Sequence, residues 1–311
     1  MQRKILITGG AGFIPSSLAD KLIQNPDNYV VAIDNFLTGS ANNLPPAKLA
    51  NYQFIKADAN SYEEMLAIMV SNKFDYVFHY AAVVGVQRTL MNPLLVLNDL
   101  RGIDNILQLA KNTGVKRIFF SSSSEVYGEP VEFPQNEDTT PLNSKLPYAI
   151  VKNVGEAFLK SYYREHGLEF TIFRFFNTYG PKQSGDFVMS RFIKAALKNE
   201  PITINGDGMQ TRTFCHIDDN IDATQIILDD SKCINDVINL GSDIELPILA
   251  LAQLIIAQTN SKSEIIHLPA LTEGDMTRRM PENSKMKSIL GRDLLPVEAG
   301  IQKILPYFIN A

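Results

Sequence analysis

The first half of the chain alternates short apolar runs with segments whose apolar residues recur at helical spacing. The apolar runs are continuous, which is typical of strands in a parallel sheet that is buried on both faces. Strand–helix repetition with short connections predicts a doubly wound α/β sheet. The predicted strands cover residues 4–8, 29–35, 52–58, 74–82, 117–124 and 170–177, and the predicted helices cover 16–25, 61–72, 105–114 and 151–167.

The pattern changes after about residue 180, where turns rich in Gly and Asp separate shorter elements. A chain of 311 residues is long enough for one large domain beside a smaller one. We therefore predict one domain over residues 1–180 and a smaller C-terminal α/β region over residues 181–311, with chain crossing between the two.

The composition argues against several classes of protein. A formal net charge of −5 provides no basic field for nucleic acid or an anionic membrane. We find no apolar stretch near the ~18 residues of a membrane span, and no signal-peptide pattern. Cys215 and Cys233 are too few for a disulfide framework, which favours a reducing, cytoplasmic compartment. With four scattered histidines, the two cysteines do not suit a zinc site, so we expect no metal.

A glycine cluster joins the first predicted strand to the first predicted helix. At Gly9 and Gly12, backbone N–H groups and the helix dipole can meet a pyrophosphate, although the spacing also suits an ordinary tight turn. We expect the donors to come from Gly12, Phe13 and Ile14. Pro15 stands where a third glycine is expected, but the first helical turn does not need its missing N–H. The turn predicts a Rossmann-type fold. The smaller region after residue 180 is expected to be the substrate-binding side.

Two aspartates follow predicted strands on the cofactor side. Asp34 ends the second strand, where a carboxylate can accept hydrogen bonds from the adenosine ribose. It would repel the 2′-phosphate of NADP, so the pattern predicts NAD. Asp58 follows the third strand and lies either near the adenine or in a solvated turn.

Tyr148 and Lys152 are four residues apart on a predicted helix and therefore share one face. A lysine ammonium near a phenol favours the phenolate, which lowers the tyrosine pKa from ~10 toward neutrality. In an arbitrary protein such a pair is more often found on the surface. Here it follows a dinucleotide turn and the serine-rich strand end at residues 121–128, and this order indicates a catalytic pair.

These motifs resemble the extended short-chain dehydrogenase/reductase family and, more narrowly, its NAD-dependent nucleotide-sugar epimerases and dehydratases. The resemblance covers essentially the full length of the chain. The segments that carry it are TGGAGFI (8–14), AIDN (32–35), HYAA (79–82), SSSSEVYG (121–128), YAIVK (148–152), RFFNTYGP (174–181), NGDGMQTRTFCHIDD (205–219) and GDMTRR (274–279).

The resemblance implies a role for each matching residue. Tyr148 would be the base that takes a proton from the sugar 4-hydroxyl, and Ser123 would hydrogen-bond the same oxygen. Lys152 would tune Tyr148 and hold the nicotinamide ribose. Asn35 and Ala81 would join the cofactor-binding residues. The substrate is implied to be a nucleotide-diphosphate sugar, whose diphosphate would be held by Asn177, Arg212 and Arg278.

The chain departs from the family pattern at several points. Asp99 stands where many relatives have asparagine. Glu125 is common in dehydratases and uronate decarboxylases, but it could also merely orient its loop. Ser124 occupies the position of the aspartic acid that protonates the leaving hydroxyl in dehydratases. Residues 180–185 lack the arginines of some uronate epimerases, which argues against a glucuronate substrate.

We favour a 4-epimerase that acts through a transient 4-keto sugar and forms a homodimer. The alternatives are a 4,6-dehydratase or UDP-glucuronate decarboxylase that uses Glu125, and a 4-dehydrogenase. A catalytically silent NAD-sensing regulator is an alternative from a different class. The intact Ser123, Tyr148 and Lys152 argue against that last alternative.

Overall fold

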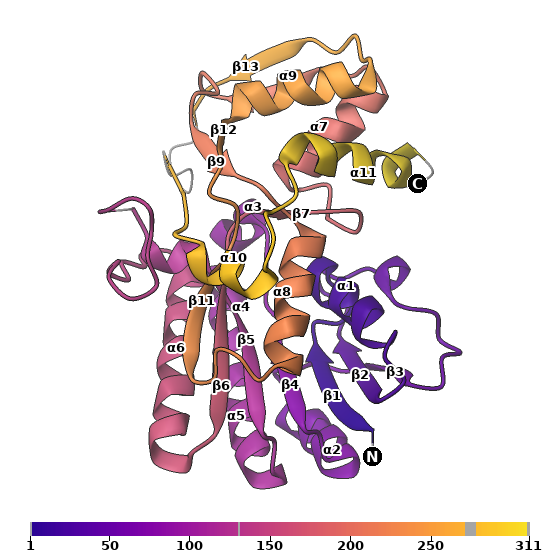
Figure 1. The fold of residues 1–311 in the computed structure, drawn as a ribbon, viewed down its shortest axis with the longest axis vertical. Helices are drawn as coiled ribbons and strands as arrows, with labels where there is room; N and C mark the ends of the chain where they lie inside the picture. Colours follow the sequence, from indigo (N-terminus) through magenta and orange to yellow (C-terminus); the bar gives the residue numbers. More distant parts are fainter. Residues whose placement is uncertain (1, 130, 271–277, 310–311) are drawn as a thin grey trace. The chain divides into compact units, whose positions relative to one another are not determined.

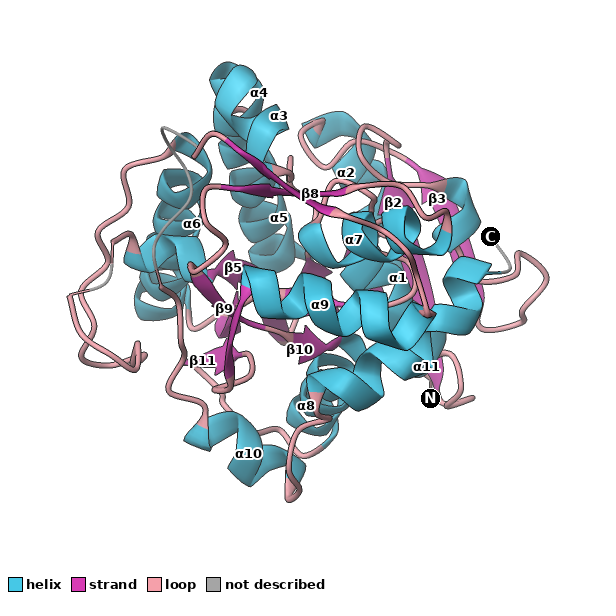
Figure 2. Ribbon diagram, turned by 90° about the horizontal axis from the view of Figure 1, so that it is seen from above, coloured by secondary structure: helices cyan, strands magenta, loops and turns pink. Residues whose placement is uncertain are grey.

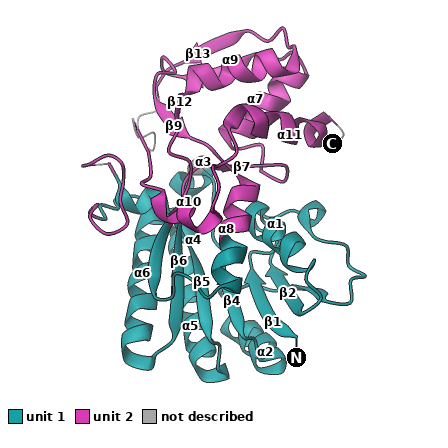
Figure 3. Cartoon of the chain, in the orientation of Figure 1, with its two compact units in different colours: residues 1–128, 142–174, 224–238 teal, residues 129–141, 175–223, 239–311 magenta. Residues whose placement is uncertain are grey.

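The computed structural model describes residues 2–129, 131–270 and 278–309. The chain forms two compact units, each assembled from separate segments (Figure 3). The first unit contains residues 1–128, 142–174 and 224–238, and the second contains residues 129–141, 175–223 and 239–311. The chain therefore passes repeatedly from one unit to the other.

The first unit is built on a seven-stranded sheet with the order β11-β6-β5-β4-β1-β2-β3 (Figure 1). The pairs β1–β2, β1–β4, β2–β3 and β4–β5 are parallel. The strand order reverses between β1 and β4, so the predicted Rossmann-type doubly wound sheet is confirmed. Its strands are β1 (Arg3–Thr8), β2 (Asn28–Asp34), β3 (Tyr52–Lys56), β4 (Tyr76–His79), β5 (Arg117–Ser123), β6 (Glu169–Phe175) and β11 (Asp236–Leu240).

Helices cover both faces of this sheet. Helix α5 packs between α2 and α6 on one face, and α1 lies on the opposite face (Figure 2). The continuous apolar strands supply the core, as Leu6, Val31 and Val77 show by having no exposed surface. The helices of this unit are α1 (Phe13–Leu22), η1 (Ala41–Asn43), α2 (Tyr62–Asn72), α3 (Val86–Met91), α4 (Pro93–Leu97), α5 (Asp99–Thr113), η2 (Ser124–Tyr127) and α6 (Pro147–His166). Helix α8 (Ile217–Asp229) belongs to the second unit up to residue 223 and to the first unit from residue 224.

Helix α5 begins at Asp99, whereas its apolar repeat by itself begins only at residue 105. The polar residues of its first turn, Asp99 and Arg101, interrupt the apolar pattern that the prediction used. An acidic residue at this end suits the positive end of the helix dipole, so the polar turn is helical. The short helices α3 and α4 were also not predicted.

The second unit has its own apolar core, which includes Phe192, Leu251 and Ile301. Helices α7, α9 and α11 pack on one another around it. Across the described residues of both units, no helix is long and apolar enough to cross a membrane. The elements of the second unit are β7 (Thr178–Tyr179), α7 (Val188–Leu197), β8 (Ile202–Asn205), β9 (Thr211–Thr213), β10 (Cys215–His216), β12 (Glu245–Pro247), α9 (Ile248–Thr259), β13 (Ile265–Leu268), α10 (Ser284–Leu290) and α11 (Val297–Ile309).

Candidate active site

The carboxyl ends of the parallel strands β1, β2, β4 and β5 meet at one edge of the sheet in the first unit. Ligands of doubly wound sheets bind at this edge, near the point where the strand order reverses. The predicted cofactor residues and the predicted catalytic residues all lie in this unit. The three predicted diphosphate ligands lie in the second unit and are described there.

The glycine turn after β1 depends on Gly9. Its φ of +72° favours glycine, and a Cβ at this position would lie 2.9 Å from the Ala81 Cα. The Gly12 N–H donates to the Gly9 carbonyl at 2.8 Å, and Gly12 then caps α1. The predicted donors Phe13 and Ile14 are the first two residues of this helix. The turn thus brings a helix N-terminus to the carboxyl edge of the sheet.

Pro15 costs the turn no hydrogen bond. The first bond of α1 runs from the Ser16 N–H to the Gly12 carbonyl at 3.1 Å. An N–H at position 15 would be one of the first four of α1, which have no acceptor within the helix. The Ala11 carbonyl, four residues earlier, accepts the Ser40 N–H at 3.0 Å and the Asn43 side-chain amide at 2.9 Å. The proline therefore leaves no acceptor without a partner.

Asp34 links the glycine turn to the loop after β2. Its carboxylate is buried and accepts the Ala11 N–H at 3.0 Å and the Phe36 N–H at 2.6 Å. A carboxylate has further lone pairs, so these two bonds leave capacity for a hydroxyl ligand. Asn35 and Asp58 shape their loops, because each accepts the N–H of the residue two positions later, at 2.9 Å.

Thr8 and His79 hold the ends of β1 and β4 together, and neither was predicted as a site residue. The Thr8 hydroxyl oxygen accepts the N–H groups of Tyr80 and Ala81 at 3.1 and 3.0 Å. Its proton is therefore free to donate to the His79 Nδ1, 2.9 Å away. This network positions Ala81 against Gly9. His79 stands in the HYAA motif, which is the signal that could have indicated it.

The predicted catalytic pair is brought together on α6. Tyr148 packs against the core of the first unit, and the Lys152 Nζ lies 5.7 Å from the centre of its ring. The same ammonium donates to the Ser121 Oγ at 3.2 Å and lies 5.0 Å from the centre of the Phe120 ring. The helix thus presents its lysine to both the tyrosine and the end of β5.

Burial controls the charge of Lys152. Its side chain is buried, which lowers its pKa to about 8, while the negative charge of Asp99 acts in the opposite direction. Burial raises the pKa of Asp99, whose carboxylate accepts the Val83 N–H at 2.8 Å. The aspartate that departs from the family pattern therefore still acts on the lysine, through its charge.

Ser123, Ser124 and Glu125 lie at the junction of β5 and η2. The Ser123 Oγ accepts the Glu125 N–H at 3.2 Å and so caps this short helix. Ser123 and Ser124 are buried, whereas Glu125 is partly exposed. The structure therefore places these three residues in one short segment at the carboxyl edge of the sheet.

In the second unit, two of the predicted diphosphate ligands, Arg212 and Arg278, lie at the β9–β12 pair, and Asn177 lies beside β10. Arg212 lies on β9 and donates to the Thr211 carbonyl at 2.7 Å. Arg278 lies over the Phe133 ring and donates to both carboxylate oxygens of Glu245, at 2.7 and 2.6 Å. Glu245 lies on β12 and was not predicted. The Asn177 backbone carbonyl accepts the Cys215 N–H at 2.9 Å.

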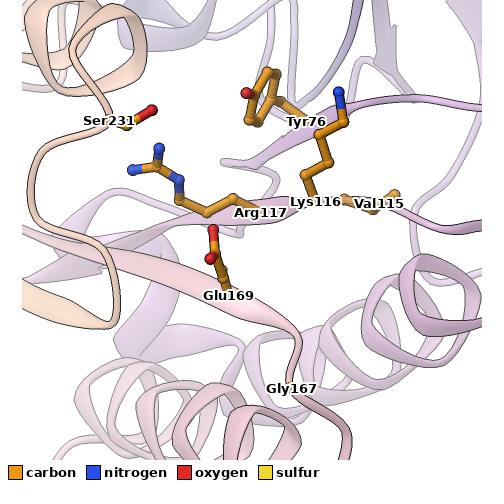
Figure 4. Close-up of a pocket in the computed structure, with 7 residues that line it drawn as sticks. All are labelled: Tyr76, Val115, Lys116, Arg117, Gly167, Glu169 and Ser231. Carbon is orange, nitrogen blue, oxygen red and sulfur yellow. The ribbon is translucent and has the colours of Figure 1, made fainter.

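A hollow of about 440 Å³ lies at the opposite end of the sheet (Figure 4). Its lining includes Tyr76, Arg117 and Glu169, which are the first residues of β4, β5 and β6. Because dinucleotides bind at the carboxyl ends of parallel strands, this hollow is not the candidate site. Within the described ranges, no group of three His, Cys, Asp or Glu residues could hold a metal.

Comparisons with known proteins agree on the family of this chain. Residues 5–241 match the model of the NAD dependent epimerase/dehydratase family. UDP-glucuronic acid decarboxylase 3 from Arabidopsis thaliana is 37% identical over 295 residues, which cover 93% of this chain and 83% of the relative. The structure of UDP-glucose 4-epimerase with UDP-glucose from Thermotoga maritima superposes with a TM-score of 0.92 at 32% identity and 99% coverage of both chains. UDP-glucuronic acid 4-epimerase from Bacillus cereus, in complex with UDP-glucuronic acid and NAD, gives 0.89 at 29% identity and 99% coverage of both.

Proposed function

Because the chain belongs to the NAD-dependent epimerase/dehydratase family, we propose that it is a nucleotide-sugar 4-epimerase that acts through a transient 4-keto sugar. The observation that carries the proposal is the proximity of Lys152 both to Tyr148 and to the serine-rich end of β5. This pair can move a proton at a sugar hydroxyl, which is the first requirement of the reaction.

The residues at the carboxyl edge fit NAD. The glycine turn lets β1 and Ala81 approach closely, and the N–H groups at the start of α1 suit a pyrophosphate. The buried Asp34 carboxylate suits a ribose with free hydroxyls and opposes a 2′-phosphate. When bound, NAD would accept a hydride from C4 of the sugar and return it.

The protein's own contribution is proton transfer at the sugar 4-hydroxyl. The Tyr148 phenolate would take the proton from O4 as the carbon–oxygen double bond forms, and would return it after the hydride comes back. Ser123 would hydrogen-bond the same oxygen. The Lys152 ammonium would favour the phenolate, because opposite charges at short range stabilise each other.

The nucleotide diphosphate would be held by Arg212 and Arg278 with Asn177. A guanidinium pairs with phosphate oxygens through two parallel hydrogen bonds, which suits it to this role. Arg278 already has a carboxylate partner in Glu245. We therefore expect a diphosphate to compete with Glu245 for this arginine.

The test of the proposal is a single incubation of the protein with UDP-, GDP-, dTDP- and CDP-sugars, followed by NMR of the products. A 4-epimer should form, and Tyr148→Phe should reduce its rate by ~10²–10⁴-fold while the nucleotide sugar still binds. Near-normal turnover by Tyr148→Phe would remove the tyrosine from the mechanism.

Decarboxylation of a nucleotide-linked uronate is the second candidate, favoured by Glu125 and by the similarity to an Arabidopsis thaliana decarboxylase. The two reactions differ at C5. Loss of carbon dioxide from a 4-keto uronate leaves an enolate that takes a proton from solvent at C5, whereas 4-epimerisation leaves C5 intact.

In deuterated water we expect no deuterium in the product, and Glu125→Gln should retain much of the activity. Deuterium at C5 with release of carbon dioxide would establish the decarboxylase instead.

We also propose that the protein is a homodimer that pairs helices α5 and α6 of two subunits. Two observations support an interface beside α6. Met91 on α3 and Leu94 on α4 are each 80% exposed, and α4 packs against α6. A partner that covers these side chains would remove apolar surface from water.

A further inference from the structure

A fully buried ion pair joins β6 to α6, the helix that carries Tyr148 and Lys152. The Arg174 guanidinium on β6 donates to both oxygens of Glu156 on α6, at 2.9 and 2.8 Å. Both residues are at most 2% exposed. Glu156 lies one helical turn after Lys152, so the pair is connected directly to the helix that carries the catalytic lysine and tyrosine.

Each member of the pair also bonds to a hydroxyl, one from the end of β5 and one from η2. The Ser122 Oγ donates to the Glu156 Oε1 at 2.6 Å. The Tyr127 hydroxyl accepts an Arg174 N–H at 2.8 Å, and the guanidinium lies 4.8 Å from the centre of the Tyr127 ring. Both hydroxyl-bearing residues are at most 2% exposed. The two contacts therefore fall on either side of the segment 123–125.

Helix α6 also lies unusually close to β5 at this point. A Cβ on Gly155 would lie 2.4 Å from the Phe120 ring, so only glycine allows this approach. Lys152 bonds to Ser121 one turn before Glu156 bonds to Ser122. Two successive turns of the helix thus hold two successive residues of the strand.

We propose that Glu156 and Arg174 are positioning residues, which hold the segment with Ser123 and Glu125 at a set distance from Tyr148 and Lys152. The proposal rests on the proposed function, because it concerns the geometry of that site. A buried ion pair is a poor way to gain stability, since desolvating two charges offsets much of their attraction. Its bonds to Ser122 and Tyr127, on either side of residues 123–125, give the pair a role in positioning that segment.

The test removes the two connections and leaves the ion pair intact. The double variant Ser122→Ala/Tyr127→Phe deletes one hydroxyl at each end of the segment. The matched control is Thr171→Val/Tyr52→Phe, which deletes buried hydroxyls of the same two kinds near the starts of β6 and β3. Both variants are measured as full-length protein with NAD bound.

The first readout needs no sugar substrate. Ultraviolet absorbance of the phenolate is titrated in each variant with and without Tyr148→Phe, so that the difference reports Tyr148 alone. We expect the connection variant to form this phenolate about one pH unit higher than the wild type, which means about tenfold less phenolate at neutral pH. The control variant should titrate as the wild type does. Equal titration of both variants would overturn the proposal.

The second readout is kcat with the nucleotide sugar found in the panel. The acid limb of the kcat profile should move up by about one pH unit in the connection variant, which means about tenfold lower kcat at neutral pH, with NAD affinity unchanged. If the wild type turns over no sugar while the phenolate titration still shifts, the proposed function fails and the positioning role stands. If the double variant does not fold, Tyr127→Phe against Tyr52→Phe decides the question by the same titration.

Discussion

At the scale of single residues, burial determines the protonation state of His79. Its ring is 3% exposed, and burial, assisted by the charge of Lys152, lowers its pKa from 6.5 to about 3. Protonation at Nδ1 would also remove the acceptor that Thr8 uses. His79 is therefore neutral in the folded protein at physiological pH.

This burial predicts a pH-dependent stability. Between pH 6.5 and about 3 the unfolded chain binds a proton at His79 that the folded chain does not. The free energy of unfolding should therefore fall as the pH falls, by at most about 1.4 kcal/mol per pH unit from this residue. Urea unfolding of His79→Gln should show a flatter pH dependence than the wild type. His166→Gln, at an exposed position on α6, is the control. Parallel curves for the wild type and His79→Gln would contradict the prediction.

Asp99 predicts a second pH effect, which concerns the pH dependence of kcat. Its negative charge raises the pKa of Lys152, which burial has lowered to about 8. Asp99→Asn keeps an acceptor for the Val83 N–H but removes the charge, so the Lys152 pKa should fall by about one unit. The alkaline limb of the kcat profile should move to lower pH by the same amount. Asp104→Asn on the same helix is the control, and an unmoved limb in Asp99→Asn would exclude this charge effect.

At the scale of elements, Pro15 tests how the start of α1 tolerates a missing donor. Position 15 is in the first turn of α1, whose N–H groups have no acceptor within the helix, so restoring an N–H there supplies no new helical hydrogen bond. Pro15→Gly should therefore change the NAD dissociation constant by less than about twofold. It should lower the free energy of unfolding by about 0.4–1 kcal/mol, because glycine leaves the unfolded chain more freedom. Calorimetric titration with NAD and urea unfolding measure the two effects. A large gain in affinity would show that the proline impairs the site.

At the scale of the whole molecule, the proposed dimer would bury apolar side chains, so a charged residue placed among them should prevent dimerisation. Light scattering at micromolar concentration should give twice the mass of one chain. Leu94→Lys should give the monomer mass, because a lysine at a position that is 80% exposed in the single chain would be buried in the dimer. Leu37→Lys alters a leucine that is 51% exposed in the loop after β2, and it should remain dimeric. A wild-type monomer at this concentration would argue against the dimer.

The sequence by itself determined the doubly wound sheet and the family. Continuous apolar strands and a glycine turn after the first strand are local features, because each is set by neighbouring residues. The Tyr148–Lys152 pair was visible for the same reason, since four residues on a helix place two side chains on one face. The apolar repeat of α5 begins only at residue 105, because the first turn of the helix is polar, so this repeat alone underestimates the length of the helix.

Only the tertiary structure decided which distant side chains meet. Arg174 and Glu156 lie 18 positions apart, and Arg278 and Glu245 lie 33 apart, so no local pattern pairs them. The Thr8–His79 bond joins two strands 71 positions apart. The low pKa of His79 also follows from burial, which is a property of the assembled core. Such contacts depend on how separate elements pack against one another, and the spacing of residues along the chain carries no information about that packing.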